Sequence, residues 1–577
     1  MPATSLPYRR FRLAVLLAFF AVRLVHAAQL VDAPALSQQR WAESDMFAFD
    51  HWAHNIAAGD WLSRQPQRPV TAWQRDVVAA YLRLEPTDPA AQEAPALAAE
   101  NLTQRWQRHP VFYQEPLFPY LLAALYAVLG DAPLLAVALQ MLVGLLGLCL
   151  LLEATRILLG EREAAWVGLL AVACGPLAYY ESLLLRETLA ITLTWLVVWR
   201  WAVARLRDDW QRWTGVGLAA GFALLARSTL LPFVAALVAV SVFGRQQRRE
   251  RLLGWALGLA VPFSCLALRN FVVGAPLLAL NGGSALAVFA ANAPGAVPWQ
   301  GLILQPELLA RFLAGADVSP LGALAAAFAA HPDWRSFLAL QLAKWQPLLH
   351  DFELPGNSSF AFYRQHAAVL RWLPVHFALA LPLGLLGGIQ AVRQRRGVIL
   401  AGLAVTALLP LVLLQPVSRY RVGLLAALLP LAAIGLGWLW DLWRRGRRGA
   451  VMAAAVALSL FAAWLDRPLP AAVPFTRAVD HAVAWQFWAK PALVQAAGAA
   501  NHAEVYDTMR LFLRGEPADL ATWPRPLRDE QTRIAEIYSE AHAIAAQALA
   551  AQGKKPEAAS ERVAAAALHR LNRGPMR

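Results

Sequence analysis

Long apolar runs, repeated along the whole chain, restrict the fold of this sequence more than any other feature. Residues 133–152, 164–180 and 421–441 are each apolar over close to the roughly 20 residues that a helix needs to cross the hydrocarbon core of a bilayer. A segment in lipid must satisfy its own backbone polar groups, so each run is predicted to be a helix. The sequence therefore predicts an all-α, polytopic membrane protein.

Eleven membrane-spanning helices are predicted in total. They cover residues 13–30, 133–152, 164–180, 187–204, 213–227, 228–243, 252–268, 372–392, 398–415, 421–441 and 449–465. The first run leads into further spans and has no convincing cleavage site, so we interpret it as a span and not as a cleaved signal. Residues 213–243 cross either twice, with a break around Arg227 and Pro232, or once as a long broken helix. Two crossings are preferred because they keep the arginine-rich residues 245–251 on the side of the other basic loops.

The arginines indicate the orientation of the chain in the membrane. With a cytoplasmic N-terminus, the inside segments hold twenty arginines: 6–12, 153–163, 200–212, 245–251, 393–396 and 442–448. The short outside linkers hold only Arg186, Arg227, Arg419 and Arg421. This excess of inside arginines is the usual signature of cytoplasmic loops, and it explains the net charge of +14 without a nucleic-acid partner. We expect a multi-pass protein of the bacterial inner (plasma) membrane, with its C-terminal domain in the periplasm.

Three large hydrophilic segments then lie on the outer side of the membrane. They are the loops 31–132 and 269–371 and the C-terminal residues 466–577. This one-sided distribution indicates a protein whose working surface is periplasmic. We therefore expect a domain over 1–465, made of spanning helices and periplasmic juxtamembrane helices, and a small helical domain over 466–577. In that second domain, residues 533–553 and the helix that follows are either half of a tetratricopeptide unit or a plain helical hairpin.

The first outer loop contains a candidate general base. Five residues share one face of a predicted interfacial helix: Asp45, Phe49, Trp52, Ala53 and Ile56. A carboxylate at the start of such a helix is suitably placed to take a proton from the hydroxyl of a membrane-bound acceptor. The alternative is that Asp45, like Ser44, only caps the helix.

Charged residues at the outer ends of the predicted spans are further candidates. Glu181 and Glu187 lie at the outer boundary, where ionisable groups are costly. A glutamate here is either a second acid near a donor or a partner of Arg186. Three arginines lie at outer span ends, against the inside bias: Arg227, Arg269 and Arg419. Arginine binds phosphate through two parallel hydrogen bonds, so the three together indicate a phosphate-lipid site, whereas each one alone is also explained by snorkelling.

With these residues the chain resembles a known family. Over roughly residues 10–465 it resembles the GT-C superfamily of membrane glycosyltransferases, in particular the family 39 branch and its RgtA/B/C/D-like relatives. Protein O-mannosyltransferases and the lipid A aminoarabinose transferase are more distant members. The resemblance rests on motifs in the same order: Asp45 with NIAAGDW (55–61), FYQEPLFPYL (112–121), LLLRETL (183–189), LRNFVVG (268–274), NGGS with AANAPG (281–295), DFELPGN (351–357) and SRYR (418–421).

The resemblance implies a GT-C-type bundle and an inverting transfer of a hexosyl or pentosyl group from a polyprenyl-phosphate donor. It implies that Asp45 is the catalytic base, that Glu187 is the acid after the third span, and that Arg419 with Tyr420 lies near the donor phosphate. Further candidate site residues are Glu115, Arg269, Asn270 and Asn292 in the matching motifs, and Glu181 and Arg227 outside these motifs. The chain departs from the family at Met46, where mannosyltransferases have a second acid, and at residues 290–292, which read AlaAlaAsn.

Several alternatives stay open on the sequence alone. A transporter or lipid-carrier flippase has a compatible number of spans, although the large one-sided loops disfavour it. A non-catalytic envelope assembly scaffold and a lipid-linked polysaccharide polymerase are further alternatives. The sequence identifies neither the sugar nor the acceptor, which is a protein, a lipid or a polysaccharide. No residue cluster indicates a metal site, but metal use varies across the superfamily, so a divalent ion also stays open.

Overall fold

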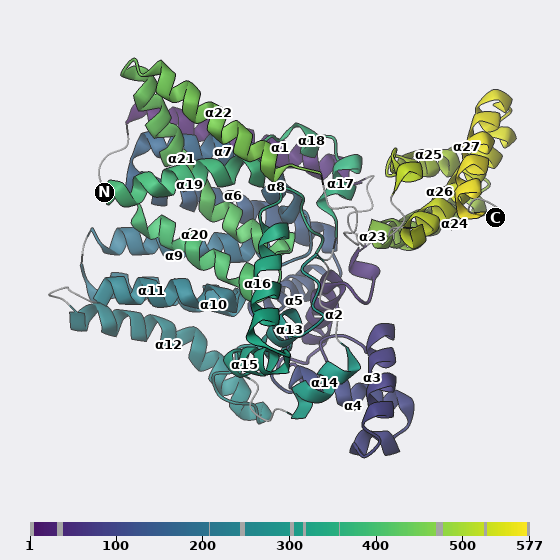
Figure 1. Ribbon diagram of the computed structural model, residues 1–577, viewed down its shortest axis with the longest axis horizontal. Coiled ribbons are helices and arrows are strands. Elements are labelled where there is room, and N and C mark those ends of the chain that lie inside the picture. Colours follow the sequence, from purple (N-terminus) through teal and green to yellow (C-terminus); the bar gives the residue numbers. More distant parts are fainter. Residues whose placement is uncertain are drawn as a thin grey trace. The chain divides into compact units, whose positions relative to one another are not determined.

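The computed structural model describes residues 5–31, 38–206, 208–242, 248–299, 305–314, 319–356, 358–468, 477–523 and 528–573. The described chain is helical throughout and contains no strand, apart from one isolated parallel bridge between Cys174 and Val375. This confirms the predicted all-α class (Figure 1). The chain divides into two compact units. The first unit consists of residues 1–23, 48–352 and 373–467, and the second of residues 24–47, 353–372 and 468–577.

Every predicted span corresponds to a helix or to a pair of helices. These are α1 (Leu6–Val31), α6 (Pro133–Leu159), α7 (Glu161–Val172) with α8 (Gly175–Glu181), α9 (Glu187–Ala204), α10 (Trp210–Ala226), α11 (Leu231–Val242), α12 (Arg248–Val273), α19 (Phe377–Arg393), α20 (Val398–Leu413), α21 (Ser418–Arg444) and α22 (Arg448–Leu465). Within the described residues, five of them (α1, α6, α12, α21 and α22) are long and apolar enough to cross a membrane, and α11, α19 and α20 are shorter apolar helices. The count of eleven crossings therefore stays a prediction.

The segment 213–243 folds as two antiparallel helices. The guanidinium of Arg251 donates to the carboxylate of Asp208, just before α10, and to the carbonyl oxygen of Ser241, at the end of α11 (2.8 Å). The start of α10 and the end of α11 therefore lie side by side, and the chain reverses between them at Arg227. This is the arrangement that the preferred prediction of two short helices requires.

The predicted span 164–180 is interrupted in the structure. Helix α7 ends at Val172, and α8 begins at Gly175 with Pro176 in its first turn. Between them, the carbonyl oxygen of Ala173 accepts a hydrogen bond from Val375 N–H (3.0 Å). The break was not predicted because its partner lies about two hundred residues further along the chain and leaves no local signal.

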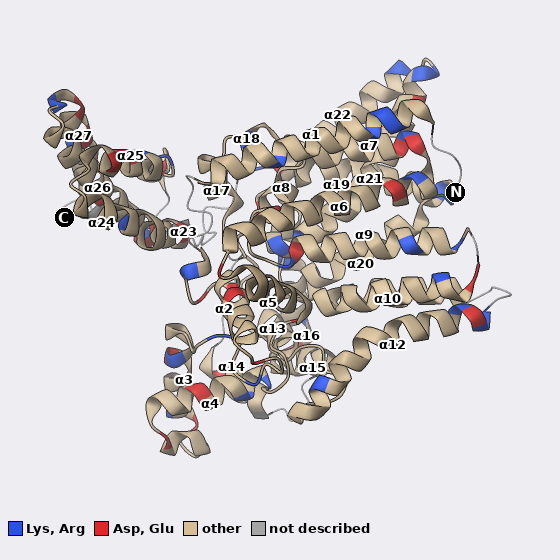
Figure 2. Ribbon diagram, turned by 180° about the vertical axis from the view of Figure 1, so that it is seen from behind, with Lys and Arg blue, Asp and Glu red and all other residues tan. Residues whose placement is uncertain are grey.

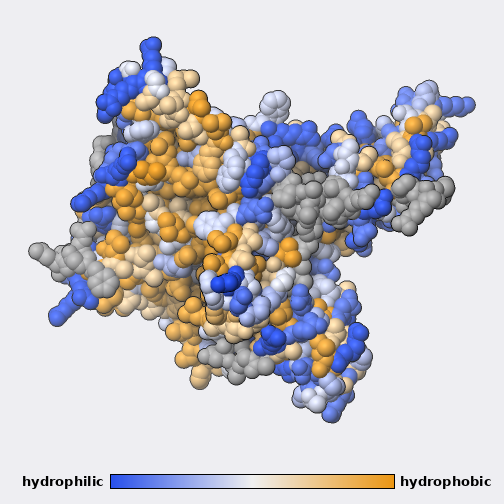
Figure 3. Space-filling view, viewed as in Figure 1, coloured by the Kyte–Doolittle hydropathy of each residue, from blue (hydrophilic) through white to orange (hydrophobic). Residues whose placement is uncertain are grey.

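The outer surface of the bundle is apolar, as lipid contact demands. Large apolar side chains such as Leu134, Val405 and Leu460 are about two-thirds exposed (64%, 65% and 67%), and Figure 3 shows apolar residues spread over the bundle. In α22, Leu465 is the one residue buried in the described structure. An apolar helix that packs on so little protein requires lipid around it. The protein is therefore a multi-pass membrane protein.

Close helix packing supports the same conclusion. A Cβ atom on Gly217 of α10 would lie 2.5 Å from the carbonyl oxygen of Trp255 in α12, and one on Gly254 of α12 would lie 2.6 Å from that of Trp210. Only glycine allows the two backbones to approach this closely. Small residues at helix contacts are typical of membrane bundles, where packing replaces the hydrophobic effect as the driving force.

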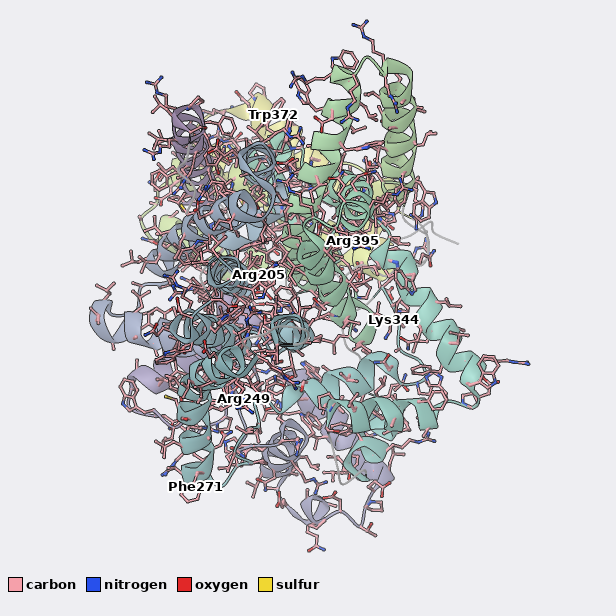
Figure 4. The ribbon with its side chains drawn as sticks, turned by 90° about the vertical axis from the view of Figure 1, so that its left-hand side faces the viewer. Arg205, Arg249, Phe271, Lys344, Trp372 and Arg395 are labelled. Carbon is pink, nitrogen blue, oxygen red and sulfur yellow. The ribbon has the colours of Figure 1, made fainter. Side chains whose placement is uncertain are left out.

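The two ends of the bundle differ: one carries many basic residues, and the other carries the helices of the predicted outer loops. Lysine and arginine gather at the end where α9 ends and where α10 and α12 begin (Figure 2). Figure 4 looks onto this end, where the exposed side chains of Arg205, Arg249 and Arg395 lie. The opposite end carries the helices of the predicted outer loops: α2 (Asp45–Ala57), α3 (Ala72–Leu84), α4 (Pro95–Gln107), α5 (Leu117–Leu129), α13 (Gly283–Asn292), α14 (Pro306–Ala314), α15 (Pro320–Ala330) and α16 (Trp334–Leu348).

The second unit is also helical. Its helices are α17 (Phe360–His366), α18 (Val369–Trp372), α23 (Arg477–Ala484), α24 (Lys490–Gly498), α25 (His502–Leu513), α26 (Arg528–Ala551) and α27 (Lys555–Arg573), with a π-helical turn over Trp485–Ala489. Phe512 stacks on Tyr538 (5.0 Å between ring centroids), and the hydroxyl of Tyr538 lies 2.8 Å from His481 Nδ1. Helices α26 and α27 form the predicted hairpin. Its identity as a tetratricopeptide unit stays a prediction.

Candidate active site

Two buried ion pairs lie at the outer end of the bundle, where α9 begins and α10 ends. Arg227 ends α10 with an extended backbone and donates through Nη1 to Glu187 Oε1 (3.1 Å). Glu187 is the first residue of α9, where the helix dipole favours a negative charge. Its second oxygen, Oε2, is buried and has no hydrogen-bond partner among the described residues. This leaves one carboxylate oxygen available inside the protein.

Arg419 and Tyr420, the ArgTyr motif, stand beside this pair. Arg227 Nη2 donates to the carbonyl oxygen of Arg419 (3.4 Å), and Arg419 Nη2 lies 3.4 Å from the hydroxyl of Tyr420. Both guanidinium groups lie close to the Tyr420 ring, at 5.1 Å for Arg227 and 5.2 Å for Arg419. The structure therefore brings together four of the predicted site residues: Glu187, Arg227, Arg419 and Tyr420.

An apolar cavity begins at this cluster. Arg227 and Tyr420 form part of its wall, and apolar side chains of α9, α11, α20 and α21 form most of the rest. The empty space here amounts to about 620 Å³, including the part that is open to solvent. A second cavity shares Ile191, Trp195 and Ala426 with the first and extends to Glu181. The site thus combines cationic groups with an adjoining apolar space, which suits a phosphate attached to a hydrocarbon chain.

Glu115 forms the second ion pair, with Arg186. Its Oε1 also accepts hydrogen bonds from the backbone N–H of Ser228 (2.8 Å), from the Ser228 hydroxyl, and from Asn281 Nδ2 (3.1 Å). Burial raises the pKa of the Glu115 carboxyl, but Arg186 and the donors of Ser228 outweigh this effect, so the net pKa is lowered. Glu115 is therefore an ionised, hydrogen-bonded centre, and the geometry favours a positioning role over proton transfer.

The NGGS motif explains how Asn281 reaches Glu115. Gly282 N–H donates to the carbonyl oxygen of Phe112 (2.6 Å), and Gly283 N–H to that of Tyr113 (3.0 Å). A Cβ atom on Gly283 would lie 2.6 Å from the Tyr113 ring. The two glycines thus allow two motifs far apart in the sequence to lie against each other, which places Asn281 over Glu115.

Glu181 pairs with a residue that the sequence analysis did not select. Arg23 of α1 donates to both of its carboxylate oxygens, through Nε to Oε2 (2.7 Å) and through Nη2 to Oε1 (3.1 Å). The alternative pairing of Glu181 with Arg186 is therefore wrong, because Arg186 pairs with Glu115. An arginine inside the predicted first span was itself a signal, since ionisable residues in spans are costly and usually paired.

Arg269 and Asn270 are occupied by the backbone. Arg269 donates to the carbonyl oxygens of Leu62 (2.9 Å), Pro110 (2.7 Å) and Ser63 (3.0 Å), and its guanidinium lies over the Phe112 ring. Asn270 Nδ2 donates to the carbonyl oxygens of Pro276, Leu277 and Ala279. These contacts join the end of α12 to the outer loops. We therefore leave both residues out of the phosphate site proposed below.

Asn292 is fully buried at the end of α13. Its amide group donates to the carbonyl oxygens of Val288 and Leu413 (2.7 Å each), and its Oδ1 accepts from Gln341 (2.9 Å) and Lys344 (2.7 Å). None of these hydrogen bonds joins Asn292 to Glu187, Arg227 or Arg419. It is instead part of a separate polar cluster around Lys344.

Asp45 is the first residue of α2 and is half-buried. It belongs to the second unit, whereas Ala48–Phe352 belong to the first. The hydroxyl of Ser44 accepts a hydrogen bond from Met46 N–H (3.0 Å), so Ser44 caps the helix. The capping function therefore does not require Asp45. Its role as a base stays a prediction.

Within the described residues, no group of three or more His, Cys, Asp and Glu side chains is arranged to hold a metal ion. Ser228, Asn281 and Arg23 were missed as contributors to the site. Ser228 follows Arg227 directly and Asn281 belongs to the NGGS motif, so their place in the sequence was a usable signal.

Part of this chain is similar to a known family of glycosyltransferases. Residues 108–268 match the sequence model of the family described as dolichyl-phosphate-mannose-protein mannosyltransferase. This match covers Glu115, Glu187 and Arg227 and confirms the predicted resemblance over this part of the chain. The chain is also similar to the crystal structure of ArnT from Cupriavidus metallidurans bound to undecaprenyl phosphate, with 16% identity, a TM-score of 0.30, and coverage of 74% of this chain and 78% of that chain. No curated protein matches the chain.

Proposed function

We propose that this protein transfers a sugar from a polyprenyl-phosphate carrier to an acceptor on the periplasmic face of the bacterial inner membrane, with inversion. The observation that carries the proposal is the cluster of Arg227, Arg419 and Tyr420 at the polar end of an apolar cavity. The hydrocarbon chain of the donor lies in the cavity, and its phosphate meets the two guanidinium groups. The family match, whose description names a lipid-phosphate sugar donor, supports this substrate class.

The charges suit the chemistry of such a transfer. The lipid phosphate is the leaving group, so fixed positive charge stabilises the bond-breaking transition state more than the ground state. Glu187 holds Arg227 in place through one oxygen and offers the other to a hydroxyl of the donor sugar. Asp45 is the proposed base for the acceptor hydroxyl on the strength of the sequence resemblance alone. The arginine-rich end of the bundle, opposite to this cluster, supports a cytoplasmic N-terminus (Figure 2).

The test is complementation of a deletion strain with mass spectrometry of its envelope glycans, glycolipids and glycoproteins. Wild type should restore one defined sugar modification, and Asp45→Asn and Arg419→Ala should fail to do so, because losing a positioned base alone typically costs about 10²–10⁴ in rate. Arg205→Ala is the matched control: Arg205 is exposed at the opposite end of α9, so this variant should restore the product.

Two results would contradict the proposal. A deletion strain with unchanged glycans but reduced flux of a lipid carrier or solute would favour a transporter or flippase. Full restoration by Arg419→Ala, with the variant present at the wild-type level in the membrane, would remove the phosphate site from the proposal.

A further inference from the structure

A buried lysine on α16 is not explained by the site described above. Lys344 is 2% exposed, and its ammonium group donates to Asn292 Oδ1 (2.7 Å), the carbonyl oxygen of Val412 (3.0 Å) and Gln341 Oε1 (3.4 Å). These neutral acceptors occupy the three donors of an ammonium group. Burial lowers the pKa of Lys344 to about 8. A charge buried with only neutral partners is expensive, so its presence calls for a role.

Its partners lie at the carboxyl end of α20. Lys344 binds the carbonyl oxygen of Val412, and Asn292 Nδ2 binds that of Leu413, the last residue of the helix. The final carbonyl groups of a helix have no partner within the helix and carry its negative dipole end. A cation and an amide donor therefore satisfy these two carbonyl groups together. Figure 4 shows Lys344 on α16 beside the bundle.

The capped end of α20 leads directly into the ArgTyr motif. Four residues, 414–417, separate Leu413 from Ser418, where α21 begins. At the far end of this connection, the hydroxyl groups of Ser418 and Tyr180 lie 2.5 Å apart. The segment before Arg419 is thus held at both ends, by Lys344 and Asn292 on one side and by Tyr180 on the other.

We propose that Lys344 and Asn292 are positioning residues that hold residues 414–420 and thereby orient Arg419 and Tyr420 for the donor phosphate. The two residues act through the end of α20 and need not touch the substrate. The inference rests on the proposed function only for the role of Arg419. The hold on residues 414–420 itself is independent of any transfer activity.

Hydrogen–deuterium exchange on the purified full-length protein tests the hold directly. Lys344→Met removes the donor to Val412 and keeps an apolar chain of similar length. Backbone N–H groups of Leu414, Tyr420 and Arg421, which bond to Pro410 and Val417, should then exchange about three to ten times faster, the change expected for the loss of one hydrogen bond. Arg335→Met, which removes an exposed cation from the same helix, is the control and should leave these rates unchanged.

A second variant guards against misfolding of the first. Asn292→Asp keeps the oxygen that accepts from Lys344 and Gln341 and supplies the lysine with a counter-charge, but it loses the donor to Leu413. It should also accelerate exchange in residues 414–421. Unchanged exchange there in both variants would overturn the inference and leave the proposed function standing.

Kinetics with a synthetic polyprenyl-phosphate sugar then test the functional half. Lys344→Met should lower kcat/KM for the donor by about 10–100-fold, since small misplacements of a site cost up to about 10²-fold. The KM for the acceptor should not change. In the background of Arg419→Ala, Lys344→Met should add little, because both changes act on the same group. Full additivity would show that Lys344 does not act through Arg419.

Faster exchange in the variants, together with no sugar transfer by wild type, would overturn the proposed function alone.

Discussion

At the scale of single residues, the site contains buried arginines that are paired with buried glutamates. Arg227 and Arg186 are each paired with one carboxylate, Glu187 and Glu115, and Arg419 lies next to Arg227. A buried pair contributes little net stability, but breaking it leaves a charge uncompensated. The pair with Glu187 therefore keeps the Arg227 guanidinium in a fixed place at the wall of the cavity, which suits the binding of an anionic lipid.

Removal of the Glu187 charge should reveal whether the arginines bind an anion. Glu187→Gln keeps the size of the side chain but leaves Arg227 without its counter-charge, so the lipid-free protein should lose about 3–5 kcal/mol of stability. A polyprenyl phosphate supplies the missing charge. Its addition should therefore raise the Tm of the variant more than the Tm of wild type, as measured by thermal unfolding in detergent.

The matched control for this experiment is Glu153→Gln. Glu153 is paired with Arg156 in α6, outside the proposed site, so the shift in Tm caused by the lipid should equal that of wild type. An equal lipid-induced shift in Glu187→Gln and wild type would contradict phosphate binding next to Arg227.

At the scale of elements, the NGGS motif forms a loop that packs against the motif containing Glu115. A Cβ atom on Gly282 would overlap the carbonyl oxygen of Gln107, a backbone atom that cannot move aside easily. Gly282→Ala should therefore push the loop away and withdraw Asn281 from Glu115. We expect a loss of about 1–3 kcal/mol, as for other overpacked sites, together with reduced transfer.

Gly402→Ala in α20 is the control for the same substitution without the clash. A Cβ atom there has no neighbour within 4 Å, and alanine favours a helix by up to about 1 kcal/mol over glycine. The control should be neutral or slightly stabilising in thermal unfolding and should keep its activity. A Gly282→Ala variant as stable and active as this control would show that the loop contact is dispensable.

The elements also show how far sequence reasoning reached. The helices of the bundle were predictable because apolar runs of this length form helices in a bilayer, and each predicted run corresponds to a helix or a pair of helices. The pairing of charges was not predictable. The place of Arg23 inside a span indicates that it has a partner, but Glu181 is 158 positions away and nothing local identifies it as that partner. Glu187, Arg227, Arg419 and Tyr420 were found because each is polar at the outer end of a predicted span or lies in a family motif. Lys344 lies in an outer loop, where a lysine is unremarkable until its burial is known.

At the scale of the whole molecule, the chain forms two compact units, and the second assembles three separate segments of sequence. Asp480 of α23 belongs to the core of this unit: it is 3% exposed, and Gln38 Nε2 donates to its Oδ1 (3.0 Å). Burial raises the pKa of Asp480 to about 8, against the lowering effect of hydrogen bonds from Ser359 and Gln38. The folded unit therefore holds a proton that the unfolded chain releases at a pH near 4.

The sign of the pH dependence follows from this difference. Between about pH 4 and pH 8 Asp480 binds more proton in the folded than in the unfolded state, so its contribution to the stability of the second unit falls as the pH rises through this window. Asp480→Asn keeps the shape and the acceptor for Gln38 but carries no titrating group. It should flatten this dependence and make the unit more stable than wild type at pH 8. Limited proteolysis or hydrogen–deuterium exchange of α23–α27 across pH 5–9 measures the effect.

Asp507→Asn is the control. The Asp507 side chain is 61% exposed, so this variant should behave as wild type. If wild type and Asp480→Asn open equally at every pH, Asp480 does not retain its proton in the folded unit and makes no such contribution to its pH dependence.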